Sequence, residues 1–289
     1  AIIQGIIQGL TEFLPVSSSG HLSLFQYFTG QSGESGILFT ILLYLGTLLA
    51  VLIAFFDTIR ELIIEFFRLL ADLFRGGFVV KGAAPARRMI LLLIVSLVPM
   101  AISVPLMDLF DRVSTDNDIV VEGICFLFTS LLLFASDRCV KGRKTAKEMK
   151  YRDALVVGGF QAIAPFPGIS RSGSTISAGL FLGLDRKYAV RFSFIMGVPT
   201  ILGANLLELK DVAGEGLSFP LPVLLTGLAA SLIFGLLAIK MVNWLVTSDK
   251  FKYFAWYTLV LGVLTLGIGV YELLSGNALQ QTILAVLAG

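Results

Sequence analysis

The hydrophobic pattern of the chain is dominated by long apolar runs. Two of them include or adjoin a single charged residue, Ile119–Ser136 with Glu122 and Phe192–Leu207 beside Arg191. Four more carry no charge at all: Ile37–Phe56, Met89–Met107, Gly216–Ile239 and Tyr253–Tyr271. A helix needs roughly 18 to 25 residues to cross a bilayer, and one charge at an end can reach the interface. The pattern therefore predicts an all-α, polytopic integral membrane protein with six transmembrane helices.

Two other apolar regions, residues 1–30 and 154–184, are each interrupted halfway by a loop of proline, serine and glycine. Irregular backbone at membrane depth occurs only where it is buried in protein or lines a wet cavity. Basic segments flank 154–184 on both ends, so this region enters and leaves the membrane on one side. We therefore expect two re-entrant helical hairpins that enter from opposite faces and share one polar cavity. Because the chain begins at Ala1 rather than at a methionine, the first hairpin is expected to lack its beginning.

The composition agrees with a membrane protein and gives it an orientation. Hydrophobic residues make up 56% of the chain and charged residues only 15%, against about a quarter in soluble domains. A net charge of +2 is too small to suggest a nucleic-acid partner. Lysine and arginine concentrate in 57–88, 137–153 and 240–252, whereas 108–118 and 208–218 carry one each. By the positive-inside rule, the first three segments are cytoplasmic and the last two external.

The two hairpins resemble each other in sequence. With an offset of 153 residues, QGLTEFLPVSSSGHL from Gln8 aligns with QAIAPFPGISRSGST from Gln161, and five of the fifteen positions are identical. Each half then has one hairpin followed by three spans, and the odd number of spans inverts the second half. We predict a single membrane domain over residues 1–289, with one repeat at about 1–136 and an inverted one at about 154–271. Inverted repeats with broken helices are known from secondary transporters.

The loop of the first hairpin carries polar side chains suited to chemistry. Gln8 and Glu12 are four residues apart and so project from one helical face. Pro15 disfavours helix at Leu14, which places Glu12 near the end of a short half-helix. A second half-helix is expected to begin at the serine cluster, where free amides form a natural anion site. The candidate residues of this second half-helix are Ser17, Ser18, Ser19 and His21.

The loop of the second hairpin repeats this design, with Arg171 in the position that Ser18 holds in the first. A planar guanidinium among hydroxyls at a helix N-terminus suits phosphate oxygens. The candidate phosphate-binding residues are Ser17, Ser19, Ser170, Arg171, Ser172 and Thr175. Gln8 and Glu12 are too few for an all-protein metal cage, but such a pair can hold Mg²⁺ or Ca²⁺ together with substrate phosphates. Phosphoryl transfer is the simplest hypothesis for the pooled groups.

Each of these residues also has a purely structural explanation. A Gln/Glu pair on a helix is usually structural, and serines in membrane segments commonly bond the preceding turn. A lone histidine such as His21 is more often a packing residue, and the glycines are most simply turn residues. Arg171 is hard to explain structurally, because no other charge lies near it in the hairpin. It is the convergence of these groups that favours function.

The segments QGLTEFLPVSSSGHL and PGISRSGSTI closely resemble the two signatures of the undecaprenyl pyrophosphate phosphatases, membrane enzymes associated with bacitracin resistance. The likeness extends over essentially the whole chain. It implies hydrolysis of an isoprenyl pyrophosphate lipid on the external side of the bacterial inner (plasma) membrane, which recycles the carrier of cell-wall synthesis. It also implies a divalent cation at Glu12 and Gln8, catalysis by Glu12, Ser18, His21 and Arg171, and phosphate binding by Arg171 and its flanking serines. Gln8 stands where the signature allows Glu or Gln. A homodimer is compatible with this resemblance.

Two other functions remain open on the sequence. A type-2 phosphatidic acid phosphatase also shows a Ser-Gly-His segment, but it needs a second histidine and this chain has only His21. A lipid or anion transporter would use the same broken-helix site to bind anionic cargo without chemistry, and fold alone does not exclude it. Release of inorganic phosphate separates the enzyme from the transporter. Which atom attacks phosphorus, Ser18, His21 or water, is not decided by the sequence, although a hydroxyl beside an imidazole favours Ser18.

Overall fold

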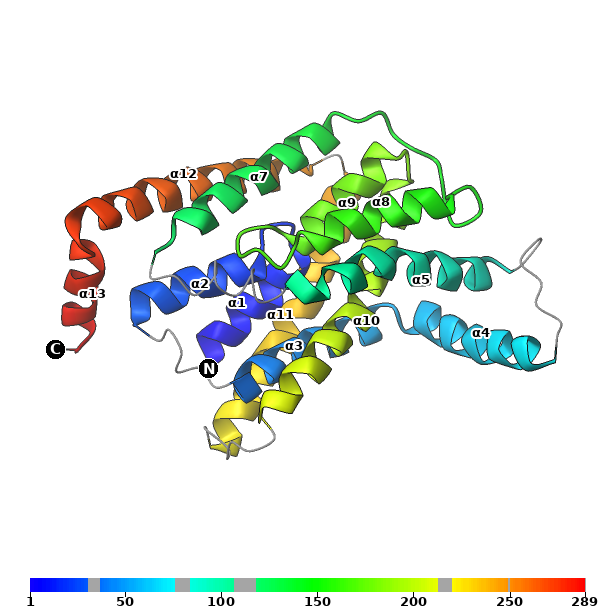
Figure 1. Cartoon of the computed structure of the whole chain (residues 1–289), viewed down its shortest axis with the longest axis horizontal. Helices are drawn as coiled ribbons and strands as arrows, with labels where there is room; N and C mark the ends of the chain where they lie inside the picture. The colour runs from blue at the N-terminus through cyan, green and yellow to red at the C-terminus, as the bar shows by residue number, and fades with distance from the viewer. Residues whose placement is uncertain (31–36, 76–83, 107–117, 213–219, 249, 289) are drawn as a thin grey trace.

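The computed structural model describes residues 1–30, 37–75, 84–106, 118–212, 220–248 and 250–288. Within these ranges the regular elements are helices, and the one extended pairing is an isolated bridge between Lys144 and Leu184. Figure 1 shows α7 and α12 side by side along one edge, with α4 and α5 extending at the opposite end from α13. The predicted all-α, polytopic membrane fold is confirmed.

The six predicted spans correspond to helices α3 (Ile37–Ala54), α5 (Pro85–Ser103), α7 (Val120–Asp137), α10 (Arg186–Val212), α11 (Leu221–Thr247) and α12 (Lys252–Ser275). Among the described residues, five of these are long and apolar enough to cross a membrane. The sixth, α3, meets that test only together with the next helix, α4 (Phe56–Phe74), from which it is bent by 89°. Of the predicted ends, Met107 and residues 216–219 lie outside the described part of the chain.

Two helices were not predicted. Segment 57–88 was expected to be a cytoplasmic loop, but most of it forms α4 and the start of α5. Helix α4 was missed because charges interrupt its apolar residues, and a search for uncharged runs does not find amphipathic helices. Its buried Glu65 accepts a hydrogen bond of 2.6 Å from Arg87, which ties α4 to α5. The second is α13 (Ala278–Ala288), whose first amides, at Leu279 and Gln280, donate to the carboxylate of Glu272.

The two interrupted regions form helix-loop-helix hairpins, as predicted. The first is α1 (Ile2–Phe13) followed by α2 (Ser18–Thr29), and the second is α8 (Tyr151–Ala162) followed by α9 (Arg171–Phe181). Leu14 is extended, as its position before Pro15 requires. Ser17 and Ser170 are the N-caps of α2 and α9, and each accepts a hydrogen bond from the amide three residues on. The serines therefore start both second half-helices. Entry of the hairpins from opposite membrane faces stays a prediction.

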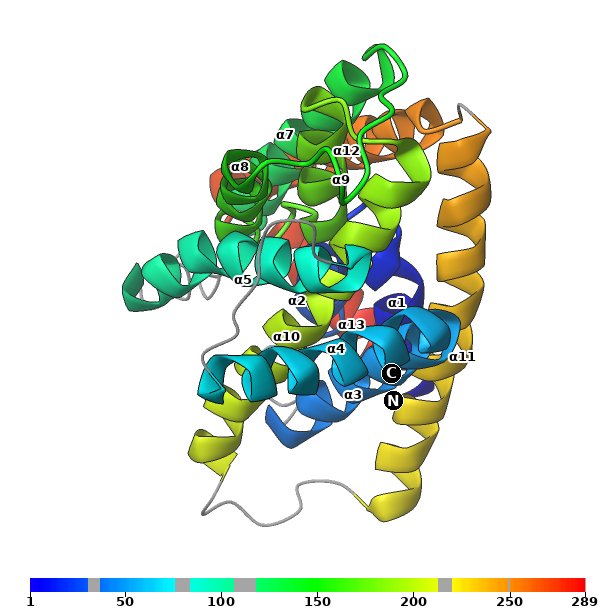
Figure 2. The ribbon, with the colours of Figure 1, turned by 90° about the vertical axis from the view of Figure 1, so that its right-hand side faces the viewer.

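The first helix of each hairpin packs against a long helix from the other half of the chain. Helix α1 of the first hairpin packs along α11 of the second half, and α8 of the second hairpin packs along α5 of the first half. Figure 2 shows α11 along one side of the molecule with α1 against it. Gly5 and Gly158, which differ by the same 153 residues, lie at the closest approaches, where an added Cβ would meet a partner backbone oxygen. This exchange supports the inverted repeat, which remains a prediction.

The glycine contact between α8 and α5 gives a stability prediction. A side chain at Gly158 would meet the carbonyl oxygen of Ser96, whereas one at the adjacent Gly159 meets no atom of the described residues within 4 Å. We expect Gly158→Val to destabilise the protein by about 1 to 3 kcal/mol or more, because overpacking forces the two backbones apart. Gly159→Val is the matched control and should be nearly neutral. Thermal unfolding in detergent measures both, and equal losses would contradict the close contact.

Candidate active site

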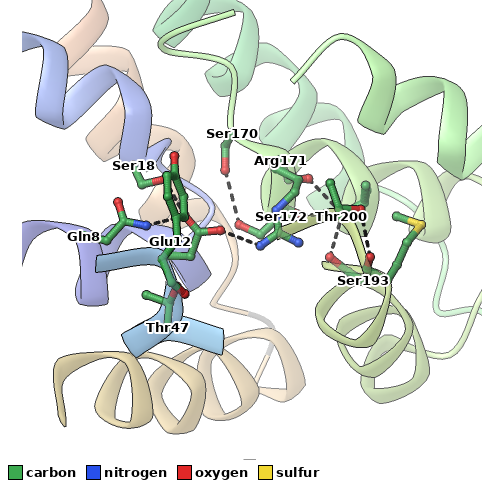
Figure 3. Close-up of polar contacts among 12 residues, drawn as sticks. Gln8, Glu12, Ser18, Thr47, Ser170, Arg171, Ser172, Ser193 and Thr200 are labelled. Carbon is green, nitrogen blue, oxygen red and sulfur yellow. Dashed lines mark hydrogen bonds and ion pairs between the residues drawn. The ribbon is translucent and has the colours of Figure 1, made fainter. Parts of the chain in front are cut away.

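The centre of the site is the carboxylate of Glu12, at the end of α1. Its Oε2 accepts a hydrogen bond of 2.7 Å from the Ser18 hydroxyl and one of 3.0 Å from the Gln8 amide nitrogen. Its Oε1 accepts one of 2.8 Å from Nη2 of Arg171, in the other hairpin. Figure 3 shows this carboxylate between Gln8 and Ser18 on one side and Arg171 on the other. Four of the predicted site residues therefore meet at one point.

Arg171 is held by packing as well as by its ion pair. It is the first residue of α9, and its guanidinium lies directly against the backbone of Gly197 on α10, in space that any side chain at 197 would fill. Its Nη1 is buried without a hydrogen-bond partner among the described residues. A buried cationic donor with a free N–H has strong affinity for an acceptor oxygen. The N-terminal end of α9 adds its positive dipole at the same place.

The loops of the two hairpins are joined by direct hydrogen bonds. The Ser17 hydroxyl accepts from the amide of Gly20 in its own hairpin and from the amide of Gly168 in the other, at 3.3 and 3.1 Å. Ser17 adopts φ of 70°, in the left-handed region that favours glycine, which costs about 1 to 3 kcal/mol. In return, the Ser172 hydroxyl donates to the carbonyl of Leu14 at 3.2 Å. Strained backbone held by cross-hairpin bonds is typical of a functional site.

A cavity of about 250 Å³ opens between these loops. Of the predicted residues, Glu12, Ser17, Ser18, Ser19, Ser170 and Arg171 line it. Its other walls are formed by Thr11, Tyr44, Met100, Gln161, Ala164, Pro165, Ile169, Thr200, Ile201, Ala204 and Asn205. A larger cavity of about 700 Å³ near Lys187 and Arg191 contains none of the predicted residues. The shared polar cavity expected from the sequence is therefore present, with charged groups on one wall and apolar side chains on others.

Four predicted residues do not line the cavity, and one of them is Gln8, which bonds Glu12. The His21 ring does not line the cavity, and its two nitrogens bond the Ser17 carbonyl at 2.7 Å and the Tyr257 hydroxyl at 2.8 Å. Its expected hydrogen bond with Ser18 is not formed, because successive positions of α2 face different sides and Ser18 turns to Glu12. Ser172 and Thr175 are buried, and their hydroxyls bond neighbouring protein groups rather than face the cavity. Their predicted phosphate contacts are not supported by this geometry.

Sequence reasoning missed one polar wall of the cavity, formed by Gln161, Thr200 and Asn205. The Gln161 amide nitrogen donates to the Thr200 hydroxyl at 3.0 Å, and Thr200 donates to the Met196 carbonyl. Two signals could have found this wall. Gln161 aligns with Gln8 in the repeat, and Asn205 is an amide in the middle of a predicted span.

The groups around Glu12 fit a cation only if substrate oxygens complete its coordination. Among the described residues there is no cluster of three or more histidine, cysteine, aspartate or glutamate side chains. Gln8 Oε1, however, is a buried acceptor without a partner in the described structure, on the residue that bonds Glu12. One carboxylate and one amide oxygen suit Mg²⁺ or Ca²⁺ bound mainly through phosphates.

Fold and site together define a polytopic membrane protein with a polar cavity, lined by Glu12 and Arg171, between two broken-helix hairpins. Residues 1–264 match the family model described as "Bacitracin resistance protein BacA". The chain belongs to this family. Among its relatives, an "Undecaprenyl-diphosphatase" from Methanosphaera stadtmanae is 40% identical over 274 residues, covering 93% of this chain and 97% of the relative. One from Alkaliphilus metalliredigens is 41% identical over 265 residues, covering 91% and 95%. The family resemblance predicted from the two signature segments is confirmed.

Proposed function

We propose that this protein is an undecaprenyl-diphosphatase, which hydrolyses undecaprenyl pyrophosphate to undecaprenyl phosphate and inorganic phosphate. The family match and the names of its relatives support this activity over the two alternatives. One observation carries the chemistry: Ser18 and Arg171 contact the two oxygens of the same carboxylate, at 2.7 and 2.8 Å. A hydroxyl, a base and a cation are thereby collected in a cavity inside a membrane protein.

The geometry supports Ser18 as nucleophile and Glu12 as its base. The Ser18 hydroxyl already donates to Glu12, so the carboxylate takes its proton as Oγ attacks the terminal phosphorus. The bond from that phosphorus to the bridging oxygen breaks, and the isoprenyl monophosphate leaves with the bonding electrons. Glu12 passes the proton it took from Ser18 to the oxygen of that leaving monophosphate. Water then attacks the Ser18 phosphoester and gives a proton to Glu12, and the bond from phosphorus to Ser18 Oγ breaks. Inorganic phosphate is released, and Glu12 returns the proton to Ser18 Oγ. Arg171 turns from Glu12 to the phosphoryl oxygens and stabilises the charge that develops there.

A divalent cation is part of this proposal. Glu12 and Gln8 Oε1 would hold it together with pyrophosphate oxygens, and it would supply positive charge against the several negative charges of the substrate. The two oxygens of the Glu12 carboxylate have different protein partners. Oε2 faces Ser18 and Gln8, and Oε1 faces Arg171.

The cellular setting is also proposed. The protein is a multi-pass membrane protein, and its basic loops favour an active site open to the external face of a bacterial inner membrane. The substrate is an isoprenyl pyrophosphate lipid taken from the surrounding bilayer. No nucleic-acid partner is expected, and a homodimer stays a prediction.

Purified protein in detergent tests the activity and the cation together. We expect release of inorganic phosphate from an isoprenyl pyrophosphate, loss of release in excess chelator, and recovery with Mg²⁺ or Ca²⁺. The reason is that, among the described residues, Arg171 is the only lysine or arginine that lines the cavity. Gln8→Glu should keep activity, since it offers a carboxylate oxygen in place of the amide oxygen. Full turnover in chelator would refute the cation. Binding without phosphate release by the untreated protein would instead favour the transporter.

A further inference from the structure

Besides the charged residues Glu12 and Arg171, the cavity lining includes two residues with amide side chains. Gln161, at the end of α8, is 1% exposed, and Asn205, on α10, is 7% exposed. Both residues line the cavity, as does Thr200, which lies on α10 with Asn205 and accepts a hydrogen bond from the Gln161 amide nitrogen. Gln161 Oε1 and both polar atoms of Asn205 have no hydrogen-bond partner among the described residues.

Unpartnered amides at this depth call for a physical explanation. A buried polar atom has lost its hydrogen bonds to water, and proteins seldom leave such an atom without a replacement. Three such atoms here belong to two residues that line one cavity of about 250 Å³. A ligand that enters this cavity can supply the missing partners.

The charge of the site indicates which ligand group belongs there. A pyrophosphate has two phosphoryl groups, and Arg171 is the only lysine or arginine that the described part of the chain contributes to the cavity lining. One guanidinium meets two oxygens of one phosphoryl group, so the second group needs other donors. Asn205 Nδ2 carries two N–H donors. The Gln161 amide can turn over to present its NH₂ group, because the Thr200 hydroxyl can both accept and donate.

The apolar lining indicates which of the two phosphoryl groups this is. Ile201 and Ala204 are the neighbours of Thr200 and Asn205 on α10, and both face the same cavity. The isoprenyl chain is joined to the phosphoryl group that remains after hydrolysis. The wall that combines amides with apolar side chains therefore matches that group, whereas Ser18 and Arg171 match the terminal one.

We propose that Gln161 and Asn205, supported by Thr200, form a subsite for the phosphoryl group that stays on the isoprenyl lipid. The inference rests on the proposed function, since it assigns the two phosphoryl groups of that substrate to two parts of one cavity. On this proposal, the amide pair contributes to the binding of a lipid-linked phosphate and not to the binding of free inorganic phosphate. The lipid product is then held by the amides after the terminal phosphate has left.

Direct binding to the full-length protein in detergent tests this subsite. The probes are farnesyl phosphate, which carries only the lipid-side phosphoryl group, and inorganic phosphate, which is expected at Arg171. Asn205→Leu should weaken farnesyl phosphate binding by about tenfold or more, because hydrogen bonds to a charged group are lost. Binding of inorganic phosphate should stay within about twofold. Asn243→Leu, the same change at an amide in the separate 700 Å³ cavity, is the control and should alter neither.

A stability readout separates ligand binding from a structural role. Because Asn205→Leu removes two buried atoms that lack partners, it should keep or raise the melting temperature of the ligand-free protein while farnesyl phosphate binding falls. Asn205→Asp is the second variant, and its negative charge should weaken farnesyl phosphate binding further. Gln161→Leu should act as Asn205→Leu does.

Three results would overturn the subsite. They are unchanged farnesyl phosphate binding in both leucine variants, an equal loss for inorganic phosphate, or tighter binding by Asn205→Asp, which would indicate a cation-binding group. Phosphate release by the unmodified protein is measured separately. Its absence would refute the proposed activity, whereas the binding comparison does not depend on turnover.

Discussion

Replacing Arg171 with alanine or lysine is expected to lower turnover by about 10² to 10³ fold, with both variants still inserted in the membrane. The guanidinium contacts Glu12 through Nη2, and its Nη1, buried beside Gly197, has no hydrogen-bond partner among the described residues. In the proposed mechanism its planar fork meets two phosphoryl oxygens once it turns from Glu12. Lysine carries the same charge but cannot reproduce that fork. Release of inorganic phosphate under saturating substrate gives the measurement. Arg191→Lys, at an exposed arginine in another cavity, is the matched control.

The same variant has a predicted effect on stability. Arg171→Ala leaves the Glu12 carboxylate, 5% exposed, without its cation, and breaking such a buried pair typically costs about 3 to 5 kcal/mol. Adding Glu12→Gln removes the stranded charge and should restore much of the melting temperature, but not turnover. Near-normal turnover in Arg171→Ala would contradict a role in phosphate binding. Stability that the second substitution fails to restore would contradict the coupling between the two residues.

Ser18→Ala is expected to reduce turnover by about 10² to 10⁴ fold, because both the attacking oxygen and the proton transfer to Glu12 are lost. Acid quenching during turnover of a substrate labelled in the terminal phosphate should trap label on the unmodified protein. The Ser18→Ala variant should carry none. Ser23→Ala is the control on the same helix, since the Ser23 hydroxyl donates to Glu122 and does not line the cavity.

Substitution of His21 distinguishes the two candidate bases. If Glu12 is the base, the labelled phosphoenzyme still forms in His21→Gln, whereas Glu12→Gln prevents its formation. The reverse result would return the base to His21 and would mean that its bond to Tyr257 breaks during catalysis.

Much of the fold followed from local patterns. Uncharged runs located the spans, Pro15 ended the first half-helix, and Ser17 and Ser170 began the next ones, because each depends on a few neighbouring residues. Helix α4 was missed because its apolar residues alternate with charges at helical spacing, and its 89° bend from α3 depends on tertiary packing.

Site residues that lie in the two short motifs were predicted from the sequence. Residues that reach the site through tertiary packing were missed. Gln8, Glu12, Ser18 and Arg171 lie in two short segments, and the predicted repeat led us to expect those segments at one cavity. The His21 ring bonds Tyr257, which is 236 residues away, and no local sequence pattern predicts that contact. Asn205 reaches the cavity because α10 passes both loops, and such a position depends on the whole helix arrangement.

If Arg171 binds the substrate phosphate as proposed, the Glu12 carboxylate competes with that phosphate for the guanidinium. In the ligand-free protein the Glu12 carboxylate is paired with this guanidinium. The apparent affinity for phosphate is then the intrinsic affinity multiplied by the fraction of molecules in which the pair is open. On the proposed function, a pocket whose one arginine among the described lining residues is already neutralised is expected to bind the singly charged headgroups of anionic phospholipids poorly, whereas a pyrophosphate carries enough charge to displace the carboxylate. In the proposed mechanism, Glu12 pairs with Arg171 again after hydrolysis and thereby helps to expel inorganic phosphate.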